Sequence, residues 1–140
     1  MVKYLLDTNI CIYLMNEQPE AAVARFDECK PGEIAISAVT WAELCAGMGV
    51  HHDRLVMEEL FNRLIPQDFG MKAALLFGEL SRKFPNRKSS FDRMIAAHAL
   101  ALGVTLVTNN TADFDIYRDS GLKLENWVDA AKPGKSATAP

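Results

Sequence analysis

The sequence lacks the features that mark several large classes of protein. No run of apolar residues approaches the length that a bilayer-spanning helix needs, so we expect no membrane segment. The three cysteines, Cys11, Cys29 and Cys45, are odd in number and do not have the spacing of paired metal ligands. We therefore expect small buried thiols in a reducing compartment. Asp7 interrupts the first apolar run, which argues against a signal peptide and favours a cytoplasmic location.

Positive charge is also limited. The 15 Lys and Arg residues are outnumbered by 18 Asp and Glu residues, for a net charge of −3. This balance argues against a protein that binds nucleic acid through a global basic field, although a local basic patch remains open. The 140 residues are 49% hydrophobic, as expected for one globular domain with its own core. We predict a single domain over 1–131 and a disordered tail, rich in Lys, Gly, Pro, Ser and Ala, over 132–140.

Short apolar runs alternate with helical patterns along the chain. Strands are predicted at 2–6, 34–36, 104–107 and 122–124, with a brief extended piece at 65–66. Helical spacing is found at 9–15, 20–29, 37–48, 53–65, 70–84 and 91–102, and loops are predicted at 85–90 and 108–115. This alternation predicts βαβ units and a three-layer α/β/α fold with a short, mostly parallel central sheet.

Four acids occupy equivalent places in this pattern. Asp7 directly follows the first strand, and Glu43 lies in the first turns of the helix after the second strand. Asp92 opens the apolar helix that leads into the strand at 104–107, and Asp113 lies in the loop after that strand. Ligand chemistry in an open parallel sheet gathers beyond the carboxyl ends of the strands. We therefore expect all four side chains near one edge of the sheet.

Each acid also has a purely structural interpretation. Asp7 or Thr8 suits the N-cap of the helix that follows. Residues 40–43 match the capping-box pattern, in which Glu43 would hold a helix start. Asp92 is favoured at a helix N-terminus, and Asp113 can close an Asx turn. These interpretations are compatible with a functional role, and the sequence leaves both open.

Taken together, the acids predict a metal site. Two carboxylates about 4 Å apart repel by about 4 kcal/mol at an effective dielectric of 20. Several such pairs rival the roughly 5–15 kcal/mol that stabilises a whole domain, so a cluster must protonate in part or bind a cation. Oxygen ligands without His or Cys favour Mg²⁺, with Mn²⁺ as the alternative. Two such ions can activate water and stabilise a leaving oxygen in phosphodiester hydrolysis.

Four segments, in order, carry a resemblance to a known family. They are LDTNICIY at 6–13, ISAVTWAEL at 36–44, FDRMIAAHA at 91–99 and VTNNTADF at 107–114. With these segments the chain resembles, from residue 2 to about 128, a PIN domain of the VapC type, the toxin of a bacterial toxin–antitoxin pair. The resemblance implies a PIN-like α/β/α fold and a Mg²⁺-dependent endoribonuclease, with tRNA as the favoured substrate.

The same resemblance implies roles for individual residues. Asp7, Glu43 and Asp92 would form the acidic metal site, and Asp113 would be its fourth acid. The polar residues that would support them are Thr8, Asn9, Thr108 and Asn110. Asn110 stands where many PIN domains carry an aspartate, which places more weight on Asp113.

The resemblance also implies partners. These are the RNA substrate, a cognate VapB-type antitoxin that silences the toxin, and a second copy of the toxin in a homodimer within a larger complex. The short apolar helical stretches at 10–14 and 53–64 offer a groove for a partner helix or for dimerisation. No membrane partner is expected.

A group of basic residues lies within the loop at 85–90 and on both sides of it. Its members are Arg82, Lys83, Arg87, Lys88 and Arg93, with Asp92 as the only acid among them. Such a local basic rim suits the positioning of phosphates without reading of bases, although a solvated helix end and loop is the alternative. Many relatives have glycines in this loop, whereas this chain has FPNRKSS at 84–90.

Two other functions remain open. An aspartyl-phosphate phosphohydrolase would use Asp7 as a nucleophile, but that chemistry needs a second acid two residues later, where this chain has Asn9. A catalytically degenerate PIN-like protein would act as a binding or assembly module, against which the intact Asp7, Glu43 and Asp92 argue. His98, within the apolar helix, is expected to be a buried, hydrogen-bonded histidine and not a general base.

Overall fold

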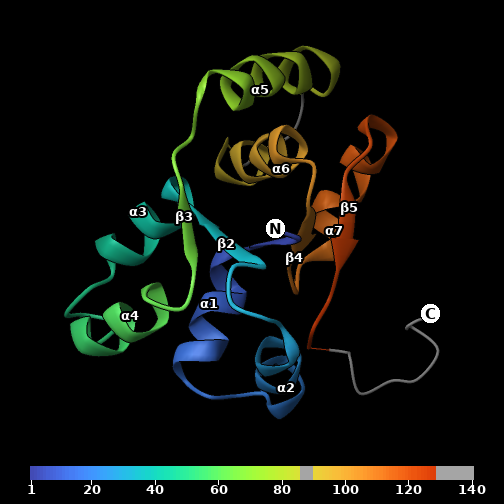
Figure 1. Ribbon diagram of the computed structural model, residues 1–140. Coiled ribbons are helices and arrows are strands. Elements are labelled where there is room, and N and C mark those ends of the chain that lie inside the picture. The colour runs from blue at the N-terminus through green and yellow to red at the C-terminus, as the bar shows by residue number, and fades with distance from the viewer. Residues whose placement is uncertain (86–89, 129–140) are drawn as a thin grey trace.

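A parallel five-stranded sheet forms the centre of the computed structural model, which describes residues 1–85 and 90–128 (Figure 1). The strand order is β3-β2-β1-β4-β5. The strands are β1 (Tyr4–Leu6), β2 (Ile34–Ser37), β3 (Ile65–Gln67), β4 (Thr105–Val107) and β5 (Lys123–Glu125). The predicted short parallel sheet is confirmed, and the extended piece at 65–66 is its edge strand, where a proline is tolerated.

Side chains on both faces of the central strands are apolar and buried. Leu5 of β1 and its neighbour Leu106 of β4 pack into one core cluster, whereas Leu6 and its neighbour Val107 pack into another. Successive strand residues point to opposite faces, so a sheet covered on both faces needs this continuous apolar pattern. The sheet is therefore the middle of three layers, as predicted.

Helices connect the strands and cover both faces. They are α1 (Thr8–Met15), α2 (Glu20–Glu28), α3 (Ala38–Ala46), α4 (Arg54–Phe61), α5 (Met71–Lys83), α6 (Ser90–Leu102), the short α7 (Thr111–Phe114) and the 3₁₀ helix η1 (Asp115–Ser120). The core around Leu5 is covered by α5, α6, α7 and η1, and the core around Leu6 by α1, α2, α4 and part of α3. Figure 1 shows α5 packed beside α6 at one end, with α1 and α2 at the other.

The predicted helices are present, with ends that differ by a few residues. The prediction of a loop over 108–115 is wrong, because α7 and the start of η1 occupy most of it. This short helix buries only Phe114, so it carries no apolar periodicity that a sequence pattern can detect. Residues 86–89, the predicted domain boundary at 131 and the predicted tail at 132–140 lie outside the described residues.

Candidate active site

Asp7 stands at the carboxyl end of β1 and at the start of α1. Its backbone N–H donates to the Val107 carbonyl of β4 at 2.9 Å. The residue is only 6% exposed, and its two carboxylate oxygens accept hydrogen bonds from the Thr8 N–H and from the Thr108 hydroxyl, each at 2.8 Å. Asp7 is therefore the N-cap of α1, as one interpretation of the sequence predicts, and it is also held from the loop after β4.

Burial raises the pKa of Asp7 above that of an exposed aspartate. The hydrogen bonds from Thr108 and Thr8 favour the charged carboxylate and oppose this effect, while the negative charges of Glu43 and Asp113 raise the pKa further. The fold therefore brings Asp7, Glu43 and Asp113 close enough to interact electrostatically, although they come from distant parts of the chain. This agrees with the predicted convergence for three of the four acids.

Glu43 reaches this point from α3. That helix begins after Ser37, whose hydroxyl caps it, and not at Thr40. The capping-box interpretation of residues 40–43 is therefore wrong, because these residues lie inside the helix. The Glu43 carboxylate instead accepts a hydrogen bond from the Thr8 hydroxyl at 2.7 Å. Thr8 thus contacts both acids, with its N–H on Asp7 and its hydroxyl on Glu43.

A further polar network holds the loop after β4. The Asn109 N–H donates to the Asn9 side-chain carbonyl at 3.3 Å, and the Asn109 side-chain amide donates to the Tyr13 hydroxyl at 3.1 Å. The Asn126 amide donates to the Asn109 side-chain carbonyl at 3.2 Å. The sequence analysis predicts Asn9 but not the other three. Asn109 could have been predicted, because it lies between the predicted supporting residues Thr108 and Asn110. Tyr13 and Asn126 are far from it in the sequence, and only the fold brings them close.

Asp113 lies in the first turn of α7 and is exposed. Its backbone N–H donates to the Asn110 carbonyl at 3.0 Å. Asn110 is also exposed and makes no side-chain cap bond to α7, but its backbone N–H donates to the Thr108 hydroxyl at 3.0 Å. The Thr108 hydroxyl therefore accepts from this loop while it donates to Asp7, so Asn110 supports the site through its backbone.

Asp92 lies half-buried in the first turn of α6. Because α6 leads into β4, its N-terminus lies toward the carboxyl edge of the sheet. The helix is also tied to the start of α3, since His98 Nδ1 and the Ser37 hydroxyl are 2.8 Å apart. His98 is 2% exposed, and burial lowers its pKa, so the predicted buried and hydrogen-bonded histidine is confirmed.

The acids do not form a compact cage. Within residues 1–85 and 90–128, no three His, Cys, Asp or Glu side chains lie close enough together to hold a metal ion by themselves. Asp7 and Glu43 are instead joined through the Thr8 hydroxyl, with Asp113 acting on Asp7 through its charge. The arrangement is an open acidic edge with one buried carboxylate at its base.

Arg93 differs from its predicted position in a basic rim. It is only 7% exposed, and its guanidinium donates to the Phe84 carbonyl at 2.7 Å, to the Ser81 hydroxyl at 3.2 Å and to the Tyr117 hydroxyl at 3.4 Å. A buried guanidinium needs such partners because leaving its donors without hydrogen bonds is costly. Arg93 therefore joins α6 to the end of α5 and to η1 and does not line the crevice.

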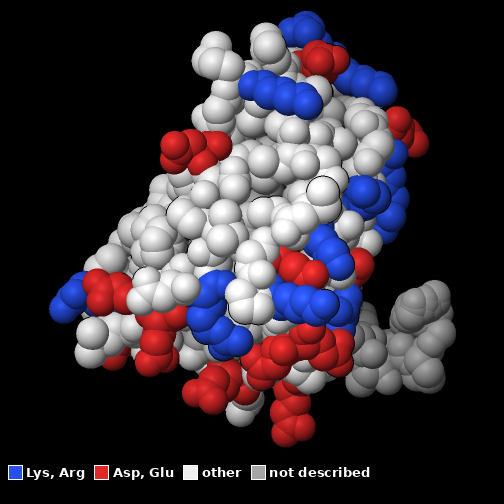
Figure 2. Space-filling model, viewed as in Figure 1, with Lys and Arg blue, Asp and Glu red and all other residues white. Residues whose placement is uncertain are grey.

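Two other members of the predicted basic rim, Arg82 and Lys83, lie at the end of α5. Arg82 and Lys83 are exposed in the last turn of that helix, where positive charge complements the helix dipole. Arg87 and Lys88 lie outside the described residues. Figure 2 shows Lys and Arg side chains over α5 at one end of the molecule, and mixed charges over α2 and α4 at the other.

The predictions about a membrane segment and about the three cysteines differ in their outcomes. No helix in the described part of the chain is long and apolar enough to cross a membrane. Cys11 is buried and Cys29 is half-buried, in agreement with small packed thiols. Cys45 is exposed on α3, so the expectation of a buried thiol is wrong at that position.

Comparison with known proteins first defines the class. The sequence profile of the PIN domain matches residues 4–119, a span that includes all four acids and every helix from α1 to α7. PIN-domain ribonucleases are generally dependent on a divalent metal ion. The open parallel sheet with an acidic carboxyl edge agrees with this class.

Individual relatives narrow the assignment. The chain is 34% identical to the tRNA(fMet)-specific endonuclease VapC of Shigella flexneri, covering 91% of this chain and 99% of the relative. It is 36% identical to the ribonuclease VapC2 of Haemophilus influenzae, covering 91% and 100%. The crystal structure of VapBC2 from Rickettsia felis, bound to a promoter DNA fragment, matches with a TM-score of 0.77 and 34% identity, covering 91% and 99%. This chain belongs to the PIN-domain family and, within it, to the VapC ribonucleases.

Proposed function

We propose that this protein is the toxin of a type II toxin–antitoxin pair and acts in the cytoplasm as a Mg²⁺-dependent endoribonuclease. The observation that carries the proposal is the hydrogen-bonded group of Asp7, Thr8 and Glu43 at the carboxyl edge of the sheet. Membership of the VapC ribonucleases supports RNA as the substrate. The name of the Shigella flexneri relative, a tRNA(fMet)-specific endonuclease, supports tRNA as the favoured RNA.

The donor chemistry of the site suits a divalent cation. The predicted ligands are carboxylates, and the groups around them are hydroxyls and amides, which are the hard oxygen donors that Mg²⁺ and Mn²⁺ prefer. Mg²⁺ usually keeps several waters and takes only one or two protein carboxylates. Asp7 and Glu43, which Thr8 holds together, supply two such carboxylates. When bound, the metal would supply an activated water and stabilise charge on the leaving oxygen.

The residues of the chain supply orientation and charge. The Asp7 carboxylate cannot turn without breaking its bond to Thr8 or to Thr108. The Thr8 hydroxyl orients Glu43 in the same way, so the two acids are positioned before any ligand arrives. The exposed Asp113 adds negative charge that already acts on Asp7. The acids that we assign to metal binding and catalysis are Asp7, Glu43, Asp92 and Asp113.

A groove between α1, α2 and α4 supports a VapB-type antitoxin as partner. Its cavity has a volume of about 350 Å³, with Leu14, Phe26 and Leu60 among its apolar residues and Asp27 and Arg63 among its charged ones. The groove coincides with the helical stretches that the sequence predicts for a partner helix. A groove lined by both apolar and charged residues suits an amphipathic helix. The Rickettsia felis neighbour is itself a toxin–antitoxin complex.

Exposed apolar side chains on α5 and α6 support the predicted homodimer. Met71 is 79% exposed, Leu75 69% and Phe91 51%, although all three are large and apolar. Met71 and Leu75 lie one turn apart at the start of α5, and Phe91 lies in the first turn of α6. Exposed apolar groups of this size are typical of a surface that another protein covers. We propose that a second copy of the toxin covers this one.

Cleavage of RNA by the purified protein tests the proposed function. The protein is incubated with tRNA in Mg²⁺ and in EDTA, beside Asp7→Asn and Asp92→Asn. Asp119→Asn, an exposed acid on η1, is the matched control. We expect Mg²⁺-dependent cuts that both site variants lose and the control keeps. Cleavage that survives in EDTA or in Asp7→Asn would contradict the proposal.

A further inference from the structure

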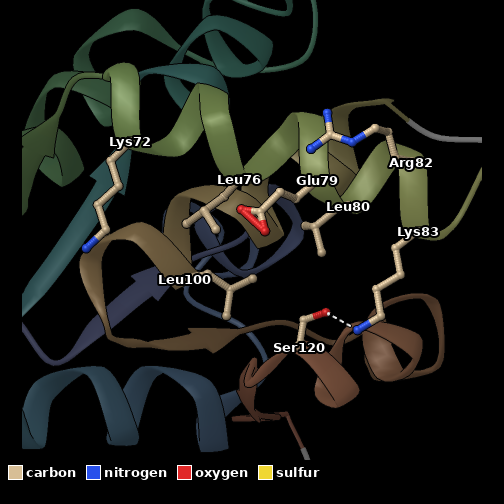
Figure 3. A pocket seen from close by; sticks show the side chains of 8 residues that line it. All are labelled: Lys72, Leu76, Glu79, Leu80, Arg82, Lys83, Leu100 and Ser120. Atoms are coloured by element: carbon tan, nitrogen blue, oxygen red, sulfur yellow. Dashed lines mark hydrogen bonds between the residues drawn. The ribbon is translucent and has the colours of Figure 1, made fainter.

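A cavity separate from the acidic edge lies at the junction of α5, α6 and η1 (Figure 3). Its volume is about 620 Å³, within the range of roughly 300–1,000 Å³ that is common for small-molecule sites. Its floor is apolar and is formed by Leu76 and Leu80 from α5 and Leu100 from α6. None of the four acids lines this cavity.

Positive charge surrounds this apolar floor. Lys72 stands at one end and Lys83 at the other, beside Ser120, while Arg82 extends from α5 in a direction away from Lys83 (Figure 3). Glu79 is the single acid among the described lining residues. No ion pair joins Glu79 to any of these cations in the described structure, although helical spacing would allow pairs with Arg82 and Lys83. The three cationic groups therefore keep hydrogen-bond donors that a ligand can use.

The walls of the cavity are fixed without a ligand. Lys83 Nζ lies 3.5 Å from the Ser120 hydroxyl, which brings the end of α5 beside η1. Behind this contact, the buried Arg93 guanidinium binds the Ser81 hydroxyl and the Tyr117 hydroxyl, and so joins the same two elements. A cavity formed in advance loses little conformational entropy when it is filled.

We propose that this cavity binds a small amphipathic anion, an acyl carboxylate, with its acid group at the Lys83 and Ser120 end. The alkyl chain would lie on the leucine floor toward Lys72. This assignment is an alternative to the phosphate-positioning role that the sequence predicts for Lys83. Single-stranded RNA is held by aromatic stacking beside cations, and no aromatic residue is among the described residues that line the cavity.

Binding of matched ten-carbon probes to the full chain tests this inference. Sodium decanoate, decanol and decylammonium are titrated separately, below their aggregation limits, into isotopically labelled protein, and backbone amide shifts are followed by NMR. We expect decanoate to shift the amides of residues 72–83, Leu100 and Ser120. Decanol should bind about tenfold more weakly, because it lacks the charge-assisted hydrogen bonds, and decylammonium should leave these amides unshifted.

Variants locate the site and separate its possible ligands. Lys83→Ala should raise the dissociation constant for decanoate about tenfold, while Lys123→Ala, an exposed lysine on β5, should leave it unchanged. If Lys83→Ala fails to fold, Lys83→Gln, which removes the charge and keeps most of the side chain, should raise the dissociation constant in the same way. Equal binding of decanol and decanoate, or shifts confined to the groove between α1, α2 and α4, would overturn the proposal. So would an RNA oligonucleotide that shifts these amides when decanoate does not.

Discussion

The hydroxyl of Thr8 donates to the Glu43 carboxylate at 2.7 Å, while the N–H of the same residue donates to Asp7 at 2.8 Å. One threonine therefore orients two acids that come from different helices. Thr8→Val keeps the shape and the N–H but removes the hydroxyl. Loss of a group that orients a metal ligand typically costs about 10–100-fold in activity or metal affinity, and we expect a fall in tRNA cleavage of that size.

Thr8→Ser provides the matched control, because it keeps the hydroxyl and loses only a methyl group. We expect it to cleave tRNA at close to the wild-type rate. Initial rates at several Mg²⁺ concentrations separate weaker metal binding from slower chemistry. Equal rates for Thr8→Val and wild type would show that the bond to Glu43 has no part in the reaction.

Replacing the buried carboxylate should stabilise the fold while it removes activity. Asp7 is buried, and the negative charges of Glu43 and Asp113 repel its carboxylate. Both effects disfavour its ionised form. Asp7→Asn removes that charge at nearly constant volume. In metal-free buffer near pH 7 we expect a higher melting temperature, since each 1 kcal/mol corresponds to about 4 °C in a domain of this size. A lower melting temperature would mean that the hydrogen bonds from Thr8 and Thr108 outweigh the cost of burial.

The stability difference between Asp7→Asn and wild type should depend on pH. Because the pKa of Asp7 is raised in the folded protein, the folded state holds this proton more tightly than the unfolded state does. At a pH below 3.8, the ordinary pKa of an aspartate, Asp7 is protonated in both states and its burial costs no stability through charge. At a pH above the raised pKa of the folded state, the buried charge lowers the free energy of unfolding by its full amount. Denaturant unfolding of both proteins, measured from pH 7 down to below 3.8, gives their free energies of unfolding. The difference between the two free energies should decrease as the pH falls. A constant difference would contradict the raised pKa.

Much of this arrangement could be predicted from local sequence. The strand that ends at Asp7, the helix that Asp92 opens and the strand before Thr108 each carry a clear pattern of apolar residues. In a parallel sheet, those patterns alone place the acids at one edge. The prediction fails where a feature depends on contacts between distant elements. Nothing local to Arg93 indicates that its guanidinium turns inward to Tyr117, since the segment reads as a basic helix start.

The error at the start of α3 has an identifiable cause. Thr40 and Glu43 match a capping box, yet Ser37 caps α3, because both residues are good caps and only the path of β2 decides between them. The same displacement frees Glu43 to accept a hydrogen bond from Thr8. Of the two interpretations that the sequence leaves open for Glu43, the structure therefore removes the capping box and leaves the role beside Asp7.

Mg²⁺ should raise the melting temperature of the wild type through its binding to the folded state. A ligand present at 100 times its dissociation constant stabilises the folded state by about 2.7 kcal/mol. We expect a rise that follows the Mg²⁺ concentration, measured by differential scanning fluorimetry at constant ionic strength. Asp7→Asn should show no such rise, and Asp119→Asn should match wild type. An equal rise in all three would point to general screening of charge.

The buried Arg93 should contribute far more to the free energy of unfolding than the exposed Arg82 does. Arg93→Met keeps the unbranched stem of the side chain but leaves the Phe84 carbonyl and the Ser81 and Tyr117 hydroxyls without their donor. A buried polar group left without its hydrogen bond costs about 1–3 kcal/mol, so we expect a loss of at least that size in the free energy of unfolding. Arg82→Met, at an exposed position in α5, should change it by no more than about 0.5 kcal/mol. Urea unfolding of both variants measures the difference, and similar values would mean that Arg93 does not hold α6 to α5 and η1.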